Sequence, residues 1–178
     1  MRRQSHNQGF YHMNRRSFLG AAAMTATAVV AEPALASTAG NPFLEAWTLP
    51  HGAPPFNRIA NAHFLPAFEH GMAVRRAEIQ AVANSAAAPT FANTIEAMER
   101  GGEVLDKVSN VFFNLSSSNT DPEIQAVQRE ISPKLTAFRN EMLLNDALFA
   151  RVDGLYRRRD RLGLSAEQRR VLERYHVM

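Results

Sequence analysis

Histidines and carboxylates are the residues of this chain best suited to hydrolytic chemistry, and few of them stand at a useful spacing. His63 and His70 are seven positions apart with Glu69 beside the second, so these side chains could share one helix face and hold a metal ion. A zinc site on one helix needs His-Glu-x-x-His, in which the histidines bind the metal and the glutamate activates water. Neither this pattern nor the inverted His-x-x-Glu-His occurs. We therefore interpret these histidines as surface or capping residues and assign no metal ligand.

Other reaction classes are no better represented. The sequence contains no cysteine, which excludes thiol catalysis, disulfides and cysteine metal sites, and it has no Gly-x-Ser-x-Gly elbow. Gly101-Gly102 lacks the lysine and the spacing of a phosphate-binding loop. The carboxylate pairs Glu96–Glu99 and Glu99–Glu103 are interspersed with Arg100, a pattern typical of a solvated helix face. No catalytic residue and no cofactor-binding residue is assigned.

Two further features could contact a ligand, and each has a structural alternative. The arginine-rich run Arg157–Arg161 could bind an anion or a peptide carboxylate, but cations at the end of a helix also offset its dipole. We favour the helix-end interpretation. Trp47 or Phe56 could touch a substrate, although large aromatic residues more often serve as buried packing. We favour packing for both.

The elements that must position these residues are organised around one long helical stretch, Pro89–Leu115. Its apolar residues recur at helical spacing, and Thr90 is placed to cap its start. Gly101-Gly102 interrupts the pattern at about 1 kcal/mol per glycine relative to alanine, so either the helix bends there or a neighbour approaches closely. A helix of this length needs partners along its apolar stripe. That stripe comprises Ile95, Met98, Leu105, Val108, Phe112 and Leu115.

A helix beginning at Pro66 is predicted before the central stretch, because proline is tolerated in a first turn. Its apolar stripe comprises Phe68, Met72, Ile79 and Val82. The residues expected to face water are Arg75, Arg76 and Glu78. Residues 84–88 then connect this helix to the central stretch.

A long helix is predicted after the central stretch, capped by Thr120 or Asp121 and opened by Pro122. Its apolar residues alternate steps of three and four, which is a seam for packing against another helix. They are Ile124, Val127, Ile131, Leu135, Phe138 and Met142.

Two shorter helices complete the prediction. One starts at Asn145 or Asp146 and ends at Gly163. Leu148, Phe149, Val152, Leu155 and Tyr156 are expected to point inward from it. The other is opened by a capping box of Ser165 and Gln168.

Residues 41–61 are rich in proline and glycine, which favours an extended arm laid over the helices. Phe43, Leu44, Trp47, Leu49 and Phe56 are expected to anchor it. No strand pattern and no internal repeat is found. The predicted fold is all-α, a mostly antiparallel helical bundle, with a leader at 1–36, the proline-rich arm at 37–62 and a helical lobe at 63–178.

The leader resembles a twin-arginine export signal. Its paired arginines, Arg15 and Arg16, stand before Phe18 and Leu19. An alanine-rich run follows, and then Ala34 and Ala36 form an Ala-x-Ala cleavage pattern before Ser37. The 12 residues of the run, 20–31, fall short of the ~20 that a membrane-spanning helix needs. We therefore expect export to a bacterial periplasm and no stable membrane span after signal removal.

The formal charge of +3 is concentrated in the leader, which holds four arginines and one glutamate. The rest of the chain then carries 16 basic and 16 acidic residues, out of 20 and 17 in the whole sequence. A nearly neutral mature chain gives no reason to expect a nucleic-acid partner.

Three long segments together resemble one protein family. Residues 89–115 (PTFANTIEAMERGGEVLDKVSNVFFNL), the preceding 41–72 and the following 132–176 are similar to the N-terminal helical region of thimet-oligopeptidase-like zinc metallopeptidases, the bacterial peptidyl-dipeptidases and oligopeptidase A in particular. The resemblance implies two helical lobes around a deep channel, with zinc at its floor hydrolysing short peptides. The N-terminal lobe would roof that channel and exclude folded proteins by size.

The resemblance does not include the family's catalytic segment, since the chain lacks His-Glu-x-x-His. We therefore expect an N-terminal fragment of an exported peptidase, truncated before its zinc site, that binds no zinc and cleaves no peptide by itself. One alternative is a self-standing periplasmic helical module that binds a peptide or a protein. Another is a remnant without function. Substrate preference and the choice between dipeptide release and internal cleavage are not encoded in this part.

Overall fold

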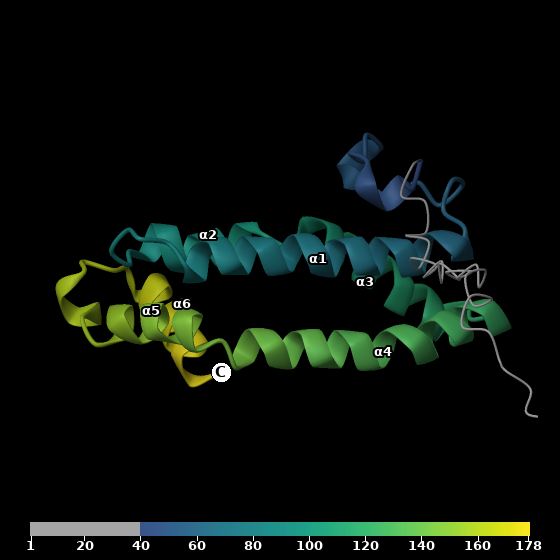
Figure 1. Ribbon diagram of the computed structural model, residues 1–178. Coiled ribbons are helices and arrows are strands. Elements are labelled where there is room, and N and C mark those ends of the chain that lie inside the picture. Colours follow the sequence, from purple (N-terminus) through teal and green to yellow (C-terminus); the bar gives the residue numbers. More distant parts are fainter. Residues whose placement is uncertain (1–39) are drawn as a thin grey trace, which may run out of the picture. The chain divides into compact units, whose positions relative to one another are not determined.

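Helices dominate residues 40–178, the part of the chain that the computed structural model describes (Figure 1). No strand occurs in this part, so the all-α prediction is confirmed. The α-helices are α1 (Phe64–Ala83), α2 (Ala97–Arg100), α3 (Glu103–Ser118), α4 (Pro122–Leu143), α5 (Asp146–Tyr156) and α6 (Ala166–Val177). Short 3-10 turns lie at η1 (Pro42–Leu44), η2 (Pro50–Gly52), η3 (Asn61–His63) and η5 (Arg159–Arg161), and a π-helical segment, η4, covers Ala92–Glu96. No helix within residues 40–178 is long and apolar enough to cross a membrane.

α1 packs against both α3 and α4, in opposite senses. Aromatic contacts pair Phe68 with Phe112, while the backbone of Leu105 lies beside Gly71, so α1 and α3 are antiparallel. Two ion pairs join α1 to α4, and the later residue of α1 pairs with the later residue of α4. They are Glu69 with Lys134 at 2.7 Å and Arg76 with Glu141 at 2.8 Å. α1 and α4 therefore run in the same direction, and α3 runs opposite to both (Figure 1).

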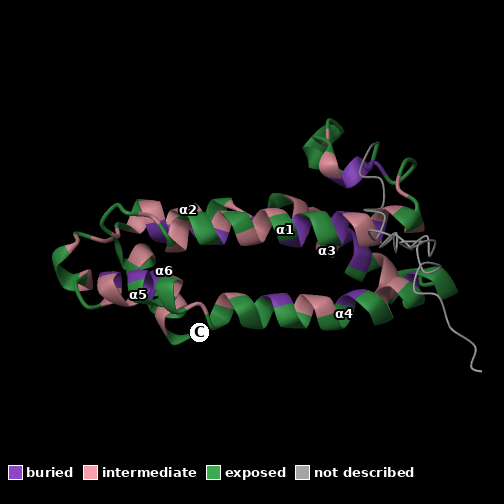
Figure 2. Cartoon of the chain, viewed as in Figure 1, coloured by how far each residue is buried: buried purple, intermediate pink, exposed green. Residues whose placement is uncertain are grey.

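The buried residues form two clusters, and Figure 2 shows them on the helix faces turned toward one another. The larger cluster joins the arm to α1, α3 and α4. Its centre is an aromatic chain in which Phe64 lies between Phe43 and Phe112, with ring centroids 5.3 and 5.0 Å apart. The smaller cluster joins η4 and α2 to α5 and α6 through Ile95, Met98, Val152, Leu155 and Leu172.

The predicted caps are confirmed at four positions. Thr90 accepts a hydrogen bond from the Asn93 N–H at 3.1 Å. The other capping bonds are Ile124 N–H to Asp121 at 2.8 Å, Leu148 N–H to Asn145 at 2.9 Å, and Gln168 N–H to Ser165 at 3.1 Å. Gln168 also accepts the N–H of Ser165 at 3.0 Å, which completes the capping box.

The central stretch is two helices where the sequence predicts one. The backbone breaks at Gly101 and Gly102, and Gly102 adopts φ 92°, which only glycine reaches without strain. A Cβ on Gly101 would overlap the side chains of Arg75 and Glu78. The helix therefore both turns at the glycines and is approached closely there. The segment before the break is π-helical over Ala92–Glu96, which no sequence pattern indicated.

α1 begins at Phe64, two residues before the predicted Pro66. Arg75 and Glu78 were expected to face water, but both side chains bind another part of the protein. The Arg75 side chain is 13% exposed and donates to the Met98 carbonyl at 2.7 Å. Glu78 accepts the Gly102 N–H at 2.8 Å. Both side chains bind the break between α2 and α3.

α5 ends at Tyr156, well before the predicted Gly163, and the 3-10 turn η5 follows. Phe149, expected to point inward, is 50% exposed. In the arm, Phe43 is fully buried as expected, whereas Leu49 and Phe56 are exposed and do not anchor it. The packing interpretation holds for Trp47, which contacts the larger cluster, and is wrong for Phe56.

Candidate functional site

The histidines and the glutamate considered above as metal ligands are not arranged to bind a metal ion. His63 precedes α1, and its Nδ1 accepts the Ala60 N–H at 3.0 Å. Glu69 is committed to its ion pair with Lys134. Within residues 40–178 no group of three or more histidine, aspartate or glutamate side chains is placed to hold a metal ion.

The carboxylates of the central stretch each bind a different partner. Glu96 pairs with Arg100 at 3.7 Å, and Glu103 pairs with Lys107, whose ammonium lowers the pKa of that carboxyl. Glu99 accepts a 2.6 Å hydrogen bond from the hydroxyl of Tyr175. Partial burial and this carboxylate together raise the pKa of Tyr175 to about 12. Glu99 therefore joins α2 to α6, while Glu96 and Glu103 form local ion pairs, so these carboxylates are not arranged as an acid/base dyad.

The arginine run after α5 binds the end of that helix. Arg158 Nε donates to the Gly154 carbonyl at 2.8 Å, and Arg159 Nη1 donates to the Tyr156 carbonyl at 2.9 Å. The guanidinium of Arg159 also lies over the Tyr156 ring, 4.2 Å from its centroid. Arg157 pairs with Asp153 at 2.8 Å and lowers the pKa of that carboxyl. These contacts agree with the helix-end interpretation.

Arg151 is a buried polar position that the sequence does not single out. It is 7% exposed and donates from Nη1 to the carbonyls of Ser85 and Ala87, at 2.9 and 3.0 Å. Its Nη2 donates to Asn93 Oδ1 at 3.1 Å. Arg151 thus fixes both the connection after α1 and the π-helical segment. A signal was present, because Arg151 falls at helical spacing between the apolar Leu148 and Leu155.

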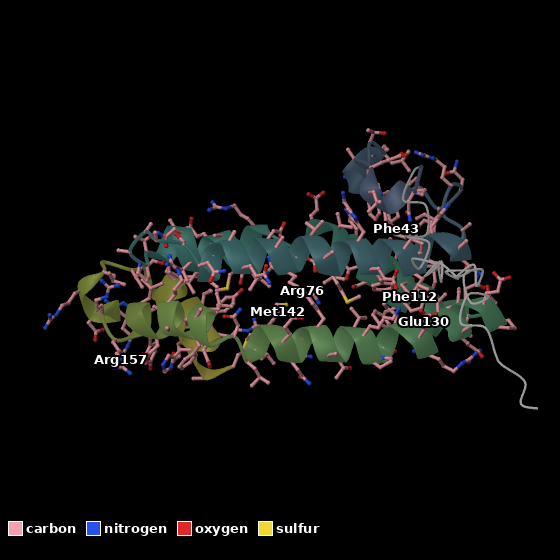
Figure 3. All side chains as sticks on the ribbon, viewed as in Figure 1. Phe43, Arg76, Phe112, Glu130, Met142 and Arg157 are labelled. Carbon is pink, nitrogen blue, oxygen red and sulfur yellow. The ribbon has the colours of Figure 1, made fainter. Side chains whose placement is uncertain are left out.

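Several hollows occur in the described surface, and two of them are candidates to receive a ligand. One is a mostly apolar pocket of about 170 Å³ between α1, the α4–α5 junction and α6, lined by Ile79, Met98, Met142, Leu148 and Tyr175 among others. Figure 3 shows Met142 and Arg76 directed between α1 and α4. The other is an open groove of about 440 Å³ between the arm and α3, lined by Trp47, Pro54, Phe56, Asp106, Asn110 and Asn114 among others. Neither combines a nucleophile with a base.

The residues predicted to direct export lie outside the described residues. They are Arg15, Arg16, Phe18 and Leu19 of the signal and Ala34 and Ala36 of the cleavage pattern. The structure therefore bears only on residues 40–178, an all-α region in which the polar contacts described above are made within and between helices.

Comparison with known proteins assigns this helical region to a class of peptidases. The chain is 45% identical over 139 residues to the dipeptidyl carboxypeptidase of Escherichia coli (strain K12), a match that covers 78% of this chain and 20% of that protein. It is 42% identical over 136 residues to the dipeptidyl carboxypeptidase of Salmonella typhimurium (strain LT2), covering 76% and 20%. No protein-family model matches. The chain thus spans about a fifth of the length of these curated relatives.

These matches show that this helical region is similar to a part of the peptidyl-dipeptidases of the thimet-oligopeptidase-like family. The resemblance drawn from the sequence is confirmed.

Proposed function

We propose that this chain forms the N-terminal helical lobe of an exported zinc metallopeptidase of the peptidyl-dipeptidase type, which acts on short peptides in the bacterial periplasm. The identity of 45% over 139 residues to a dipeptidyl carboxypeptidase carries this proposal. The lobe would roof the substrate channel, so that unstructured peptides enter and folded proteins do not. Its contribution is steric selection of the substrate and not proton transfer.

The packing of the lobe suits a rigid wall. The backbone of Leu105 lies close enough to Gly71 that an added Cβ would meet it at 3.0 Å, so α1 and α3 are in close contact. The aromatic chain from Phe43 to Phe112 ties the arm to the same pair of helices. A wall of this kind keeps its shape when a peptide passes along it.

Zinc is implied by the family, and the residues described here do not fit it. His63 and Glu69 are occupied by the contacts given above, and residues 40–178 offer no cluster of metal-binding side chains. No catalytic step is therefore derived from this chain. The hydrolytic chemistry belongs to residues of the longer enzyme that this lobe would cover.

A chimaera tests the proposal. The matching segment of the Escherichia coli relative is replaced by the corresponding residues of this chain, and release of dipeptides from the C-terminus of a short peptide is measured. We expect the chimaera to retain activity within about tenfold, because 45% identity preserves the core contacts. The matched control carries Phe112→Asp, which places a charge in the core and should abolish folding and activity together. A chimaera that folds with the melting behaviour of the parent but releases no dipeptide would refute the assignment.

The second candidate is a self-standing helical module that binds a peptide without cleaving it. The open groove between the arm and α3 favours it, since its volume lies in the range of ligand sites. Solution behaviour separates the two candidates. A lobe shaped to cover a larger enzyme should self-associate through exposed apolar side chains such as Leu144 and Phe149, whereas a module should remain monomeric.

A further inference from the structure

The groove between the arm and α3 has two unlike walls. The arm contributes an apolar wall from Trp47, Pro54 and Phe56, and Phe56 is 55% exposed. α3 contributes a polar wall. The Trp47 indole donates to the Pro42 carbonyl at 2.9 Å, so this side chain is fixed in place. The groove is therefore built before any ligand arrives.

Three polar side chains form a straight row along the α3 wall. Asp106, Asn110 and Asn114 are four positions apart, which places them one above the other at steps of ~6 Å along the helix. All three are exposed, and none makes a side-chain hydrogen bond to any residue of the described part of the chain. Each carboxamide offers one acceptor and two donors to a ligand.

The step of this row matches an extended peptide. Alternate residues of an extended chain are ~6.6 Å apart, close to the ~6 Å between Asn110 and Asn114. In an extended chain the N–H and the C=O of one residue point to the same side, so a carboxamide can bind both at once. Two carboxamides at this spacing can therefore bind alternate residues of the peptide, while the intervening side chains meet Trp47 and Phe56.

The charge in the groove favours a basic ligand. Glu103 and Lys107 neutralise each other, and the Lys107 ammonium lies over the Trp47 ring, 5.3 Å from its centroid. Asp106 forms no ion pair within residues 40–178, so one negative charge remains uncompensated at one end of the row. A cationic side chain two or three residues from the bound carboxamides would complement it.

We propose that this groove is a docking site for an extended peptide with a basic residue, bound by Asn110 and Asn114 through its backbone and by Asp106 through its charge. The proposal goes beyond the peptidase assignment, because it concerns binding by this region alone and requires no catalytic centre. The peptide is a separate molecule, of the short unstructured kind.

Trp47 gives a direct readout, because it is the only tryptophan in the sequence and it lines the groove. The 178-residue chain is titrated with acetyl-Ser-Ala-Lys-Ala-Ser-Ala-amide while the tryptophan fluorescence is followed. Two companion peptides carry norleucine or glutamate in place of the lysine. We expect saturable quenching or a spectral shift, with the lysine peptide bound at least about tenfold more tightly than the glutamate peptide and losing this preference in high salt.

Variants distinguish specific binding in the groove from non-specific electrostatic attraction. The double variant Asn110→Ala/Asn114→Ala should weaken binding of the lysine peptide about tenfold, because two pairs of backbone hydrogen bonds are lost. Asp106→Asn should remove the preference for lysine over norleucine and leave binding of the norleucine peptide unchanged. The matched controls are Asn140→Ala and Glu173→Gln, exposed residues of α4 and α6 outside the groove, which should leave binding unchanged.

The proposal is overturned if no peptide changes the fluorescence at millimolar concentration. It is also overturned if the double variant, shown by circular dichroism to keep the helical content of the parent, binds the lysine peptide as the parent does. Neither result touches the peptidase assignment, which the activity of the chimaera decides separately.

Discussion

Glu78, in the C-terminal half of α1, accepts a 2.8 Å hydrogen bond from the backbone N–H of Gly102, at the break between α2 and α3. Arg75, one turn earlier, donates to the carbonyl of Met98 at 2.7 Å, on the other side of the same break. One face of α1 thus satisfies a donor and an acceptor that the interrupted helix leaves free. The glycines and the ion pair of Arg75 with Glu78 form a single structural unit.

Substituting Gly102 by alanine should destabilise the fold. The residue has φ 92°, where a side chain is strained, so Gly102→Ala should lower the free energy of unfolding by about 1–3 kcal/mol. Gly154→Ala is the matched control, because that glycine lies inside α5 with open space around its missing side chain. It should raise stability by about 0.5–1 kcal/mol. Urea unfolding followed by circular dichroism measures both, and equal signs for the two variants would contradict the account.

The buried guanidinium of Arg151 should be the most sensitive polar position. Arg151→Ala removes four hydrogen bonds and leaves the carbonyls of Ser85 and Ala87 without that donor, so we expect the free energy of unfolding to fall by about 2–4 kcal/mol. Arg151→Lys keeps the charge but cannot bind all four acceptors and should be intermediate. Arg139→Ala, at an exposed position of α4, should change stability by less than about 0.5 kcal/mol. Urea unfolding tests the order of the three variants; a lysine variant as stable as the parent would show that charge alone matters.

Whether a contact could be predicted depended on how far apart in sequence its two residues lie. The caps at Asp121, Asn145 and Ser165 were predictable, because a cap binds a backbone N–H three residues away and needs no tertiary information. Arg75 was misplaced, because its partner Met98 is 23 residues distant in sequence. A charged residue at helical spacing is assigned to the solvent face unless its remote acceptors are known.

The candidate sites divide in the same way. The absence of a His-Glu-x-x-His pattern can be read directly from the sequence, and so can the family resemblance. The groove could not be predicted, because it depends on how the arm crosses α3, and the arm has little periodicity to indicate its path. Phe56 illustrates this, since its residue type predicts burial and only the folded arm shows that it stays exposed.

The pair formed by Tyr175 and Glu99 should be visible in an alkaline titration. The pKa of Tyr175 is raised to about 12 in the folded chain, so the neutral phenol is favoured there. Above the ordinary pKa near 10 the unfolded chain releases this proton and the folded chain keeps it, so stability falls as the pH rises from ~10 to ~12. Ultraviolet absorbance should show one of the three tyrosines ionising late.

Two variants test whether the late ionisation belongs to Tyr175. Tyr175→Phe should remove it, and Glu99→Gln should move it toward lower pH, because the carboxylate no longer disfavours the phenolate. Burial is the larger cause of the shift, so Glu99→Gln should not restore the ordinary pKa completely. A late step that persists in Tyr175→Phe would belong to another tyrosine and contradict the assignment.

Metal analysis tests whether the chain carries zinc by itself. The purified 178-residue chain, incubated with zinc and passed through a desalting column, should retain far less than one ion per chain, because residues 40–178 provide no cluster of ligands. His63→Ala/His70→Ala should retain the same small amount. One tight zinc per chain, lost in this double variant, would establish the scattered site that the spacing of these histidines suggests.

The paired arginines of the leader should direct export, and a conservative exchange separates their identity from their charge. Arg15→Lys/Arg16→Lys preserves both positive charges but not the guanidinium groups, so it should stop transport through a twin-arginine route while leaving the apolar run intact. Arg2→Lys/Arg3→Lys is the matched control and should be exported as the parent is. Cell fractionation of a bacterium with a working twin-arginine pathway measures the periplasmic share, and mass spectrometry should find a mature chain beginning at Ser37. If the Arg15/Arg16 variant reaches the periplasm as efficiently as the control, the leader works by another route, and the twin-arginine assignment is wrong.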